Sequence, residues 1–140
     1  MPTRKAHARW EGTIKDGKGT VDFGNGAFKG PYSFGSRFAD GAGTNPEELL
    51  GAAHAGCFAM ALSGNLGKRG FTADNIDASA HVTLELKDGK QTVTKIHLDV
   101  TAKVPNITPE AFAEAAAETK TGCPISRLLN AEITLDAKLA

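Results

Sequence analysis

Residues 45–66, NPEELLGAAHAGCFAMALSGNL, predict one long apolar helix around which the rest of the chain is organised. Asn45 is suited to cap this helix, and Pro46 is favoured at the first helical position. Glu47 and Glu48 then lie in the first turn, where the helix dipole stabilises negative charge. The rest of the helix has almost no polar face and many small residues. We therefore expect it to be buried at the centre of the molecule or of an oligomer.

Strands are predicted on both sides of this helix. Before it, short alternating segments punctuated by glycine indicate a meander of strands near positions 6–11, 20–23 and 28–34. After it, residues 75–104 alternate between apolar and polar side chains in two runs, which predicts a long hairpin.

The C-terminal part of the chain predicts two helices and a final strand. Thr108 begins a helix that we expect to reach about Lys120. Cys123 is expected to cap a second, short helix that has Pro124 at its first position. Apolar residues alternate again over positions 133–139, as in a strand. Helical blocks among antiparallel strands indicate an α+β fold, with an antiparallel sheet and a central buried helix.

The turn of the hairpin is expected to contain three residues. The apolar residues of both strands have even numbers, and directly opposed residues share a face of the sheet, so the numbers of each pair must add to an even value. A two-residue loop between Lys87 and Lys90 gives an odd sum. A three-residue loop with Gly89 in the left-handed conformation gives an even one. If the pairs add to 178, His81 lies opposite His97, a solvated pair to which we assign no function.

The composition favours one globular domain over residues 1–140. Sixteen basic residues balance sixteen acidic ones, which argues against a nucleic-acid-binding or membrane-surface protein. We expect no stretch apolar enough to span a membrane, and the polar N-terminus predicts no secretory signal. A cytoplasmic location follows as an expectation. There, two cysteines are too few for a structural zinc site and point to redox or catalytic chemistry.

These two cysteines are the first candidates for chemistry. A helix N-terminus stabilises a thiolate, so the predicted cap position favours a reactive Cys123. Cys57 is predicted in apolar surroundings at mid-helix, which raise the pKa of a thiol, and it is a packing residue unless a cation lies nearby. Arg37 and His54, the latter one helical turn before Cys57, are the candidate cations. The spacing of His54 and Cys57 is also used in metal sites, but no further ligands cluster with them, so we predict no metal and no cofactor.

The position of Glu47 favours a site shared by two copies of the chain. Glu47 and Cys57 are ten residues apart, which separates them by about 15 Å on one straight helix. If both residues act in one site, an arginine must bridge them, the helix must break, or a second subunit must contribute. Together with the apolar character of the helix, this geometry predicts a homodimer.

Four segments spread along the chain form a recognisable combination. They are PYSFGSRF at 31–38, TNPEELLGAAHAGCF at 44–58, GCPIS at 122–126 and AEITL at 131–135. This combination resembles the OsmC/Ohr family of thiol-dependent peroxidases over essentially the whole chain, and more the osmotically inducible branch than the organic-hydroperoxide-resistance branch. The resemblance implies a single OsmC-like domain that forms an intertwined α+β homodimer with two sites at the subunit interface.

The resemblance also implies roles for particular residues. Cys57 would be the peroxidatic cysteine and Cys123 the resolving cysteine. Arg37 would activate the Cys57 thiolate and Glu47 would orient Arg37. Glu48 would remain structural.

The implied activity is that of a cysteine-based hydroperoxide reductase in oxidative and osmotic stress defence. Organic hydroperoxides would be reduced to alcohols, and hydrogen peroxide less efficiently, through a Cys57 sulfenic acid and a Cys57–Cys123 disulfide. An external dithiol, lipoyl-linked in parts of the family, would reduce that disulfide. The alternatives are a non-enzymatic dimer that binds a small ligand and keeps two inert cysteines, and a structural or interaction protein.

Overall fold

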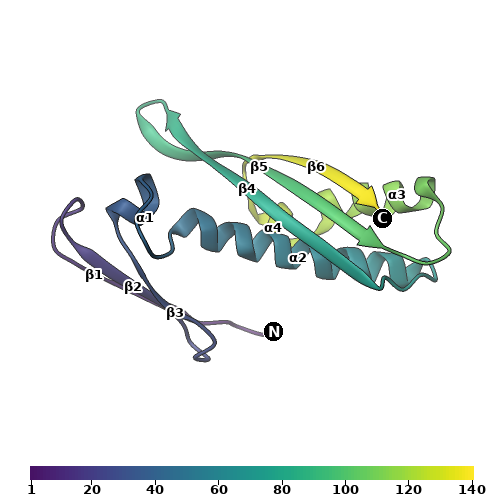
Figure 1. Ribbon diagram of the computed structural model, residues 1–140, viewed down its shortest axis with the longest axis horizontal. Helices are drawn as coiled ribbons and strands as arrows, with labels where there is room; N and C mark the ends of the chain where they lie inside the picture. The colour runs from purple at the N-terminus through teal and green to yellow at the C-terminus, as the bar shows by residue number, and fades with distance from the viewer. The chain divides into compact units, whose positions relative to one another are not determined.

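The computed structural model describes residues 1–140, which divide into two compact units, Met1–Leu49 and Leu50–Ala140. Ten helices and strands follow one another along the chain (Figure 1), and they include two three-stranded sheets, one in each unit. The expected α+β class is confirmed. The strands are divided between two sheets, a division that the sequence analysis did not predict. That residues 1–140 act as one domain stays a prediction.

An antiparallel meander forms the sheet of the first unit, as the sequence predicted. Its strands pair in chain order, β1 (Ala6–Glu11), β2 (Lys18–Phe23) and β3 (Lys29–Tyr32). Gly19 on β2 pairs with Trp10 on one side and with Tyr32 on the other, and the centroids of these two rings are 5.4 Å apart. A Cβ on Gly19 would lie 2.5 Å from a Tyr32 ring carbon, so the close approach of the two tilted rings requires glycine here.

A short helix, α1 (Phe34–Phe38), follows β3 and carries Arg37. It begins with a reciprocal capping box. Ser33 Oγ accepts a hydrogen bond from the Ser36 N–H at 3.1 Å, and Ser36 Oγ accepts one from the Ser33 N–H at 2.8 Å. The Asn45 side chain donates to the Ser36 carbonyl at 3.0 Å. These bonds fix the helix that carries Arg37 against the cap of the next helix.

The long helix α2 runs without a break from Pro46 to Lys68. Asn45 Oδ1 accepts a bond from the Glu48 N–H at 2.8 Å, which confirms the predicted cap. The buried residues all lie on one face of the helix: Gly51, His54, Phe58, Leu62 and Leu66. Only one face of the helix is therefore covered within a single chain, and its burial at the centre of an oligomer stays a prediction. The other face carries small apolar residues that no part of the chain covers. It also carries Met60, which is 80% exposed.

α2 also meets the length and hydropathy criteria of a membrane-spanning helix, contrary to the sequence expectation. Its most apolar 18-residue stretch passes both criteria, although less than a third of that stretch is buried within this chain. Alanine, glycine and a scarcity of charges give this hydropathy without the bulky side chains that usually mark a span. One such helix is weak evidence of a membrane, because core helices of soluble proteins pass the same test.

The sheet of the second unit has its strands in the order β4 (Asn75–Lys87), β5 (Lys90–Lys103) and β6 (Glu132–Leu139). β4 is antiparallel to β5, but β6 is parallel to β5, which the expected antiparallel sheet did not include. The chain passes through two helices, α3 (Pro109–Gly122) and α4 (Pro124–Leu128), before β6 begins. A helical crossover of this kind returns the chain in the parallel direction.

The core of the second unit lies between the central strand and two helices (Figure 1). It contains alternate residues of β5 and the buried side chains of α2 and α3, namely Ile96, Leu98, Val100, Ala102, Phe58, Leu62, Leu66, Phe112 and Ala115. The predicted caps are confirmed, with Thr108 at the start of α3 and Cys123 at the start of α4.

The hairpin turn differs from the expectation. Lys87 pairs with Lys90, so the loop contains two residues rather than three. Asp88 and Gly89 have φ values of 52° and 76°, the left-handed pair that a tight Asp-Gly turn requires.

A β-bulge resolves the conflict between this turn and the pattern of the strands. Leu84 pairs with Val93 whereas Thr83 pairs with Lys95, so one residue of β5 is extra. Beyond the bulge the pair numbers add to 178, and His81 lies opposite His97 as the sequence predicted. The predicted register of the core pairs is therefore confirmed, but the extra residue lies in the bulge of β5 and not in the turn.

Candidate thiol site

The structure brings the two cysteines together within the second unit. Cys57 is half-buried on α2, Cys123 is buried at the start of α4, and both are free thiols. The Cys57 thiol forms hydrogen bonds with the Cys123 side chain and with the backbone of Ile125. The two residues that the sequence singled out for thiol chemistry are therefore neighbours, although 66 positions separate them along the chain.

The surroundings of Cys57 in this unit disfavour its thiolate. Burial raises the pKa of Cys57, the Ile125 backbone lowers it, and the neighbouring Cys123 thiol raises it further. A buried thiol reacts slowly unless a positive charge stabilises its anion. Reactivity at Cys57 therefore requires a cation that the second unit does not place beside it.

Cys123 occupies the cap position that the sequence predicted. Its Sγ accepts a hydrogen bond from the Ser126 N–H at 3.4 Å and donates one to Ser126 Oγ at 3.1 Å. Pro124 lies at the beginning of the helix, where its missing N–H leaves no bond unmade. The resulting orientation of the Cys123 side chain is fixed by α4 itself.

His54 has a different partner from those the sequence offered. It is fully buried, and its Nε2 lies 2.7 Å from Ser126 Oγ. Burial lowers the pKa of His54, so the imidazole is not the cation that Cys57 lacks. Sequence reasoning missed Ser126, and the available signal was its position three residues after the capping Cys123, where a cap side chain bonds to the backbone.

No cluster of three or more His, Cys, Asp or Glu side chains suitable for a metal ion is present. His54 and Cys57, whose spacing raised the possibility of a metal, instead contact Ser126 and Cys123 respectively.

Arg37 and Glu47 form an ion pair in the first unit. Arg37 Nη2 lies 2.6 Å from one carboxylate oxygen, and Nε lies within 3.1–3.2 Å of both oxygens. The Glu47 side chain is only 14% exposed, which shields the pair from solvent. The Arg37 guanidinium also lies over the Phe38 ring, 5.2 Å from its centroid. Glu48 takes no part in these bonds and donates its backbone N–H to the cap.

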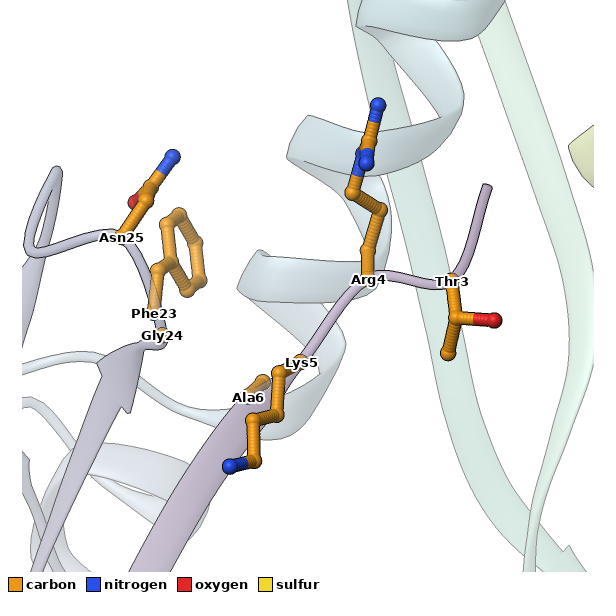
Figure 2. Close-up of a pocket in the computed structure, with 7 residues that line it drawn as sticks. All are labelled: Thr3, Arg4, Lys5, Ala6, Phe23, Gly24 and Asn25. Carbon is orange, nitrogen blue, oxygen red and sulfur yellow. The ribbon is translucent and has the colours of Figure 1, made fainter. Parts of the chain in front are cut away.

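A surface hollow of about 450 Å³ lies elsewhere in the first unit, where β1 begins and β2 ends (Figure 2). The side chains of Arg4 and Lys5 point in opposite directions there, so their charges do not converge on one ligand. The lining residues, Thr3, Arg4, Lys5, Ala6, Phe23, Gly24 and Asn25, include none of the predicted site residues.

Comparison with known proteins relates the whole chain to one family. A family model described as OsmC-like protein matches residues 39–138. Peroxiredoxin OsmC of Escherichia coli (strain K12) and that of Shigella flexneri are each 50% identical over 137 residues, which cover 97% of this chain and 96% of the relative.

Solved structures show the same fold. An OsmC-like protein of unknown function from Vibrio cholerae has a TM-score of 0.80 at 18% identity, covering 98% of this chain and 99% of its own. The organic hydroperoxide resistance protein OhrB of Bacillus subtilis has a TM-score of 0.72 at 23% identity, covering 99% of this chain and 98% of its own.

Proposed function

The chain belongs to the OsmC-like family, and on this premise we propose that it is a thiol-dependent peroxidase that reduces organic hydroperoxides. Relatives that are 50% identical to this chain are named peroxiredoxins, which supports peroxidase activity. The observation that carries the proposal is the contact between Cys57 and Cys123, a half-buried thiol beside a buried one. A two-cysteine peroxidase requires this arrangement, because the second thiol must reach the oxidised first one.

The complete site is proposed to form between two copies of the chain. α2 is unbroken between Glu47 and Cys57, so the two residues of one chain are about 15 Å apart along the helix. A break in the helix is therefore not what brings them into one site. The exposed apolar face of the same helix, where Met60 is 80% exposed, favours a covering partner. In the proposed homodimer, the Arg37–Glu47 pair of one subunit lies beside the thiols of the other.

Arg37 supplies the cation that Cys57 lacks. Its charge stabilises the thiolate against the burial that raises the Cys57 pKa. Glu47 fixes the guanidinium by bonds to Nε and Nη2, which leaves Nη1 outside the ion pair and able to bind peroxide oxygens.

The first step of the reaction oxidises Cys57. The thiolate attacks the terminal oxygen of ROOH, so an S–O bond forms and the O–O bond breaks. The alkoxide takes up a proton and leaves as an alcohol, and Cys57 becomes a sulfenic acid.

The second step closes a disulfide. The Cys123 sulfur attacks the Cys57 sulfur, water leaves, and further oxidation of Cys57 is prevented. An external dithiol reduces the disulfide by exchange, and we propose a lipoyl-linked dithiol for this role. The proposal places this cycle in the cytoplasm, in defence against oxidative and osmotic stress.

The preferred substrates are proposed to be organic hydroperoxides rather than hydrogen peroxide. Leu50, Ala53 and Ala61 share the helical stripe of Cys57, so its surroundings are apolar. An apolar wall favours the organic group of the substrate. Equal kcat/KM values for cumene hydroperoxide and hydrogen peroxide would count against this preference.

A thiol count tests the proposed function. Free thiols are measured in the reduced protein before and after one equivalent of cumene hydroperoxide. We expect two thiols to be lost in the wild type, and a sulfenic acid to be trapped on Cys57 in Cys123→Ser. Two unchanged thiols in the wild type would instead support a dimer that binds a small ligand and keeps inert cysteines.

A further inference from the structure

We propose that His54 and Ser126 form a proton relay that prepares the Cys123 thiol to close the disulfide. The inference rests on the proposed peroxidase function, because the relay serves the second of its two thiol steps. His54 lies in the middle of α2 and Ser126 in α4, 72 positions further along the chain.

A continuous chain of hydrogen bonds joins the imidazole to the sulfur. Cys123 Sγ donates to Ser126 Oγ at 3.1 Å, and Ser126 Oγ lies 2.7 Å from His54 Nε2. A hydroxyl that accepts the thiol proton has its own proton free to donate, and His54 Nε2 is the acceptor that it faces. The donors therefore run in one direction, from thiol through hydroxyl to imidazole.

Packing alone does not account for a histidine at this position. His54 is fully buried on the face of α2 that otherwise carries Phe58, Leu62 and Leu66. Its Nδ1 is buried and has no hydrogen-bond partner. A buried polar atom without a partner lowers stability, so an apolar side chain would suit the core better. What histidine provides here, and an apolar side chain would not, is the hydrogen bond to Ser126.

The protonation state of His54 suits a proton acceptor. Burial lowers the pKa of His54, and no charged side chain contributes to that shift. The imidazole is therefore neutral at neutral pH. The titratable groups near the relay are the thiols of Cys57 on α2 and Cys123 at the start of α4. The core residues on β4, β5 and α3 that cluster with the buried side chains of α2 include the apolar Ala80, Val82, Ile96, Leu98 and Phe112. Thr119 of α3 adds a buried hydroxyl that is bonded to Asn65 of α2.

The relay acts while the disulfide forms. The Cys123 proton passes to Ser126 Oγ as the hydroxyl proton passes to His54 Nε2, so the sulfur attacks as a thiolate. The S–S bond forms and the S–O bond of the Cys57 sulfenic acid breaks. The departing hydroxide takes up a proton and leaves as water, and His54 returns to its neutral form. The net change is one sulfenic acid and one thiol converted to one disulfide and one water.

Rapid-quench kinetics test this role. Reduced full-length protein is mixed with one equivalent of cumene hydroperoxide, and sulfenic acid, sulfinic acid and disulfide are quantified over time by mass spectrometry after dimedone trapping. We expect Ser126→Ala and His54→Gln to form the disulfide about tenfold or more slowly than the wild type, and to accumulate sulfenic acid. Ser126→Thr, which keeps the hydroxyl, should restore most of the rate.

The pH dependence separates proton transfer from mere positioning. In the wild type, the rate of disulfide formation should fall at acidic pH as His54 becomes protonated and can no longer accept. His54→Gln keeps a polar side chain but cannot take up a proton, so its slower rate should lose the part of the fall that comes from His54 and keep only the pH dependence that any attacking thiol has. A purely structural role would change the rate without changing the shape of the profile.

Thr119→Val is the matched control. Thr119 is a buried hydroxyl on α3 that accepts a bond from the Asn65 side chain of α2 at 2.9 Å, as Ser126 on α4 bonds to His54 of α2. It lies outside the relay, so disulfide formation should keep the wild-type rate. Wild-type rates in both Ser126→Ala and His54→Gln would overturn the relay. A wild type that forms neither sulfenic acid nor disulfide would overturn the peroxidase function itself.

Discussion

Arg37 binds the Glu47 carboxylate through its Nε and Nη2 edge, with Nη2 2.6 Å from one carboxylate oxygen and Nε 3.1–3.2 Å from both. The carboxylate thus engages two of the three guanidinium nitrogens and leaves the Nη1 edge outside the pair. Such bidentate bonds fix the plane of a guanidinium, which a lysine could not reproduce. A thiolate or a peroxide oxygen at that remaining edge would meet an oriented positive charge.

Replacing Arg37 with alanine should remove most peroxidase activity and leave the fold intact. A preorganised cation at the reacting atoms contributes on the order of 100-fold or more to the rate, so kcat/KM for cumene hydroperoxide should fall by about that factor. The control is Arg69→Ala, which breaks the exposed ion pairs of Arg69 with Glu114 and Glu118 on α3. Full activity in Arg37→Ala would retire the role assigned to Arg37.

The same substitution should shift the reactivity of Cys57 to higher pH. Burial raises the pKa of Cys57, and the thiolate is the reactive form, so alkylation accelerates as the pH rises through that pKa. Without the Arg37 charge, the acceleration should begin at higher pH. Site-specific mass spectrometry of iodoacetamide labelling measures the profile, and superimposable profiles for the two proteins would contradict thiolate stabilisation by Arg37.

Mixing two inactive variants should restore activity if the site is shared between subunits. Arg37→Ala keeps Cys57, and Cys57→Ser keeps Arg37. After unfolding and refolding of an equal mixture, half of the dimers are mixed and each has one complete site of two, which gives roughly a quarter of wild-type activity. Each variant refolded alone is the control. A mixture as inactive as its parents would place Arg37 and Cys57 of the same chain in one site.

A charge on the exposed face of α2 should separate the subunits. Met60 is 80% exposed in the single chain, and the proposed partner would cover it. Met60→Glu would bury an unpaired carboxylate in that interface, which is costly, so the variant should elute as a monomer in size-exclusion chromatography with light scattering. Lys95→Glu, at an exposed position on β5, is the control and should remain dimeric. A monomeric wild type would dismiss the dimer altogether.

Stability should fall in mild acid because of His54. Burial lowers the pKa of His54 in the folded state, so below the ordinary histidine pKa the unfolded chain binds a proton that the folded chain does not. The stabilisation is present above that pH and is lost as the pH falls, by at most about 1.4 kcal/mol per pH unit for one proton. The free energy of unfolding, measured with urea at several pH values, should fall less steeply in acid for His54→Gln than for the wild type. The control is His81→Gln, at an exposed position, which should show the same pH dependence as the wild type. Parallel curves for His54→Gln and wild type would contradict this assignment.

The sequence predicted those features that depend on neighbours along the chain. The caps at Asn45, Thr108 and Cys123 follow from local rules for helix starts. The hairpin and its core register follow from alternation, since a shifted register would expose the apolar face. These predictions needed no knowledge of the rest of the molecule.

Features that depend on distant contacts were missed or mistaken. The parallel direction of β6 depends on the path of α3 and α4, which alternation does not encode. The bond between His54 and Ser126 joins positions 72 residues apart and has no local signature. The Arg37–Glu47 pair was expected from the family resemblance alone, because neither residue carries a pattern that reveals its partner.

The bulge near the tip of the hairpin separates the turn from the core. Register is normally fixed at the turn, so a change in loop length alters every pair along both strands. Here the step between Thr83 and Leu84 absorbs the odd residue before the strands reach the core, where His81 still lies opposite His97. Leu86, close to the turn, is 68% exposed. The tip is therefore a natural insertion point, where a fluorophore-bearing loop or affinity tag could be added without changing the register of the strands that form the core with α2.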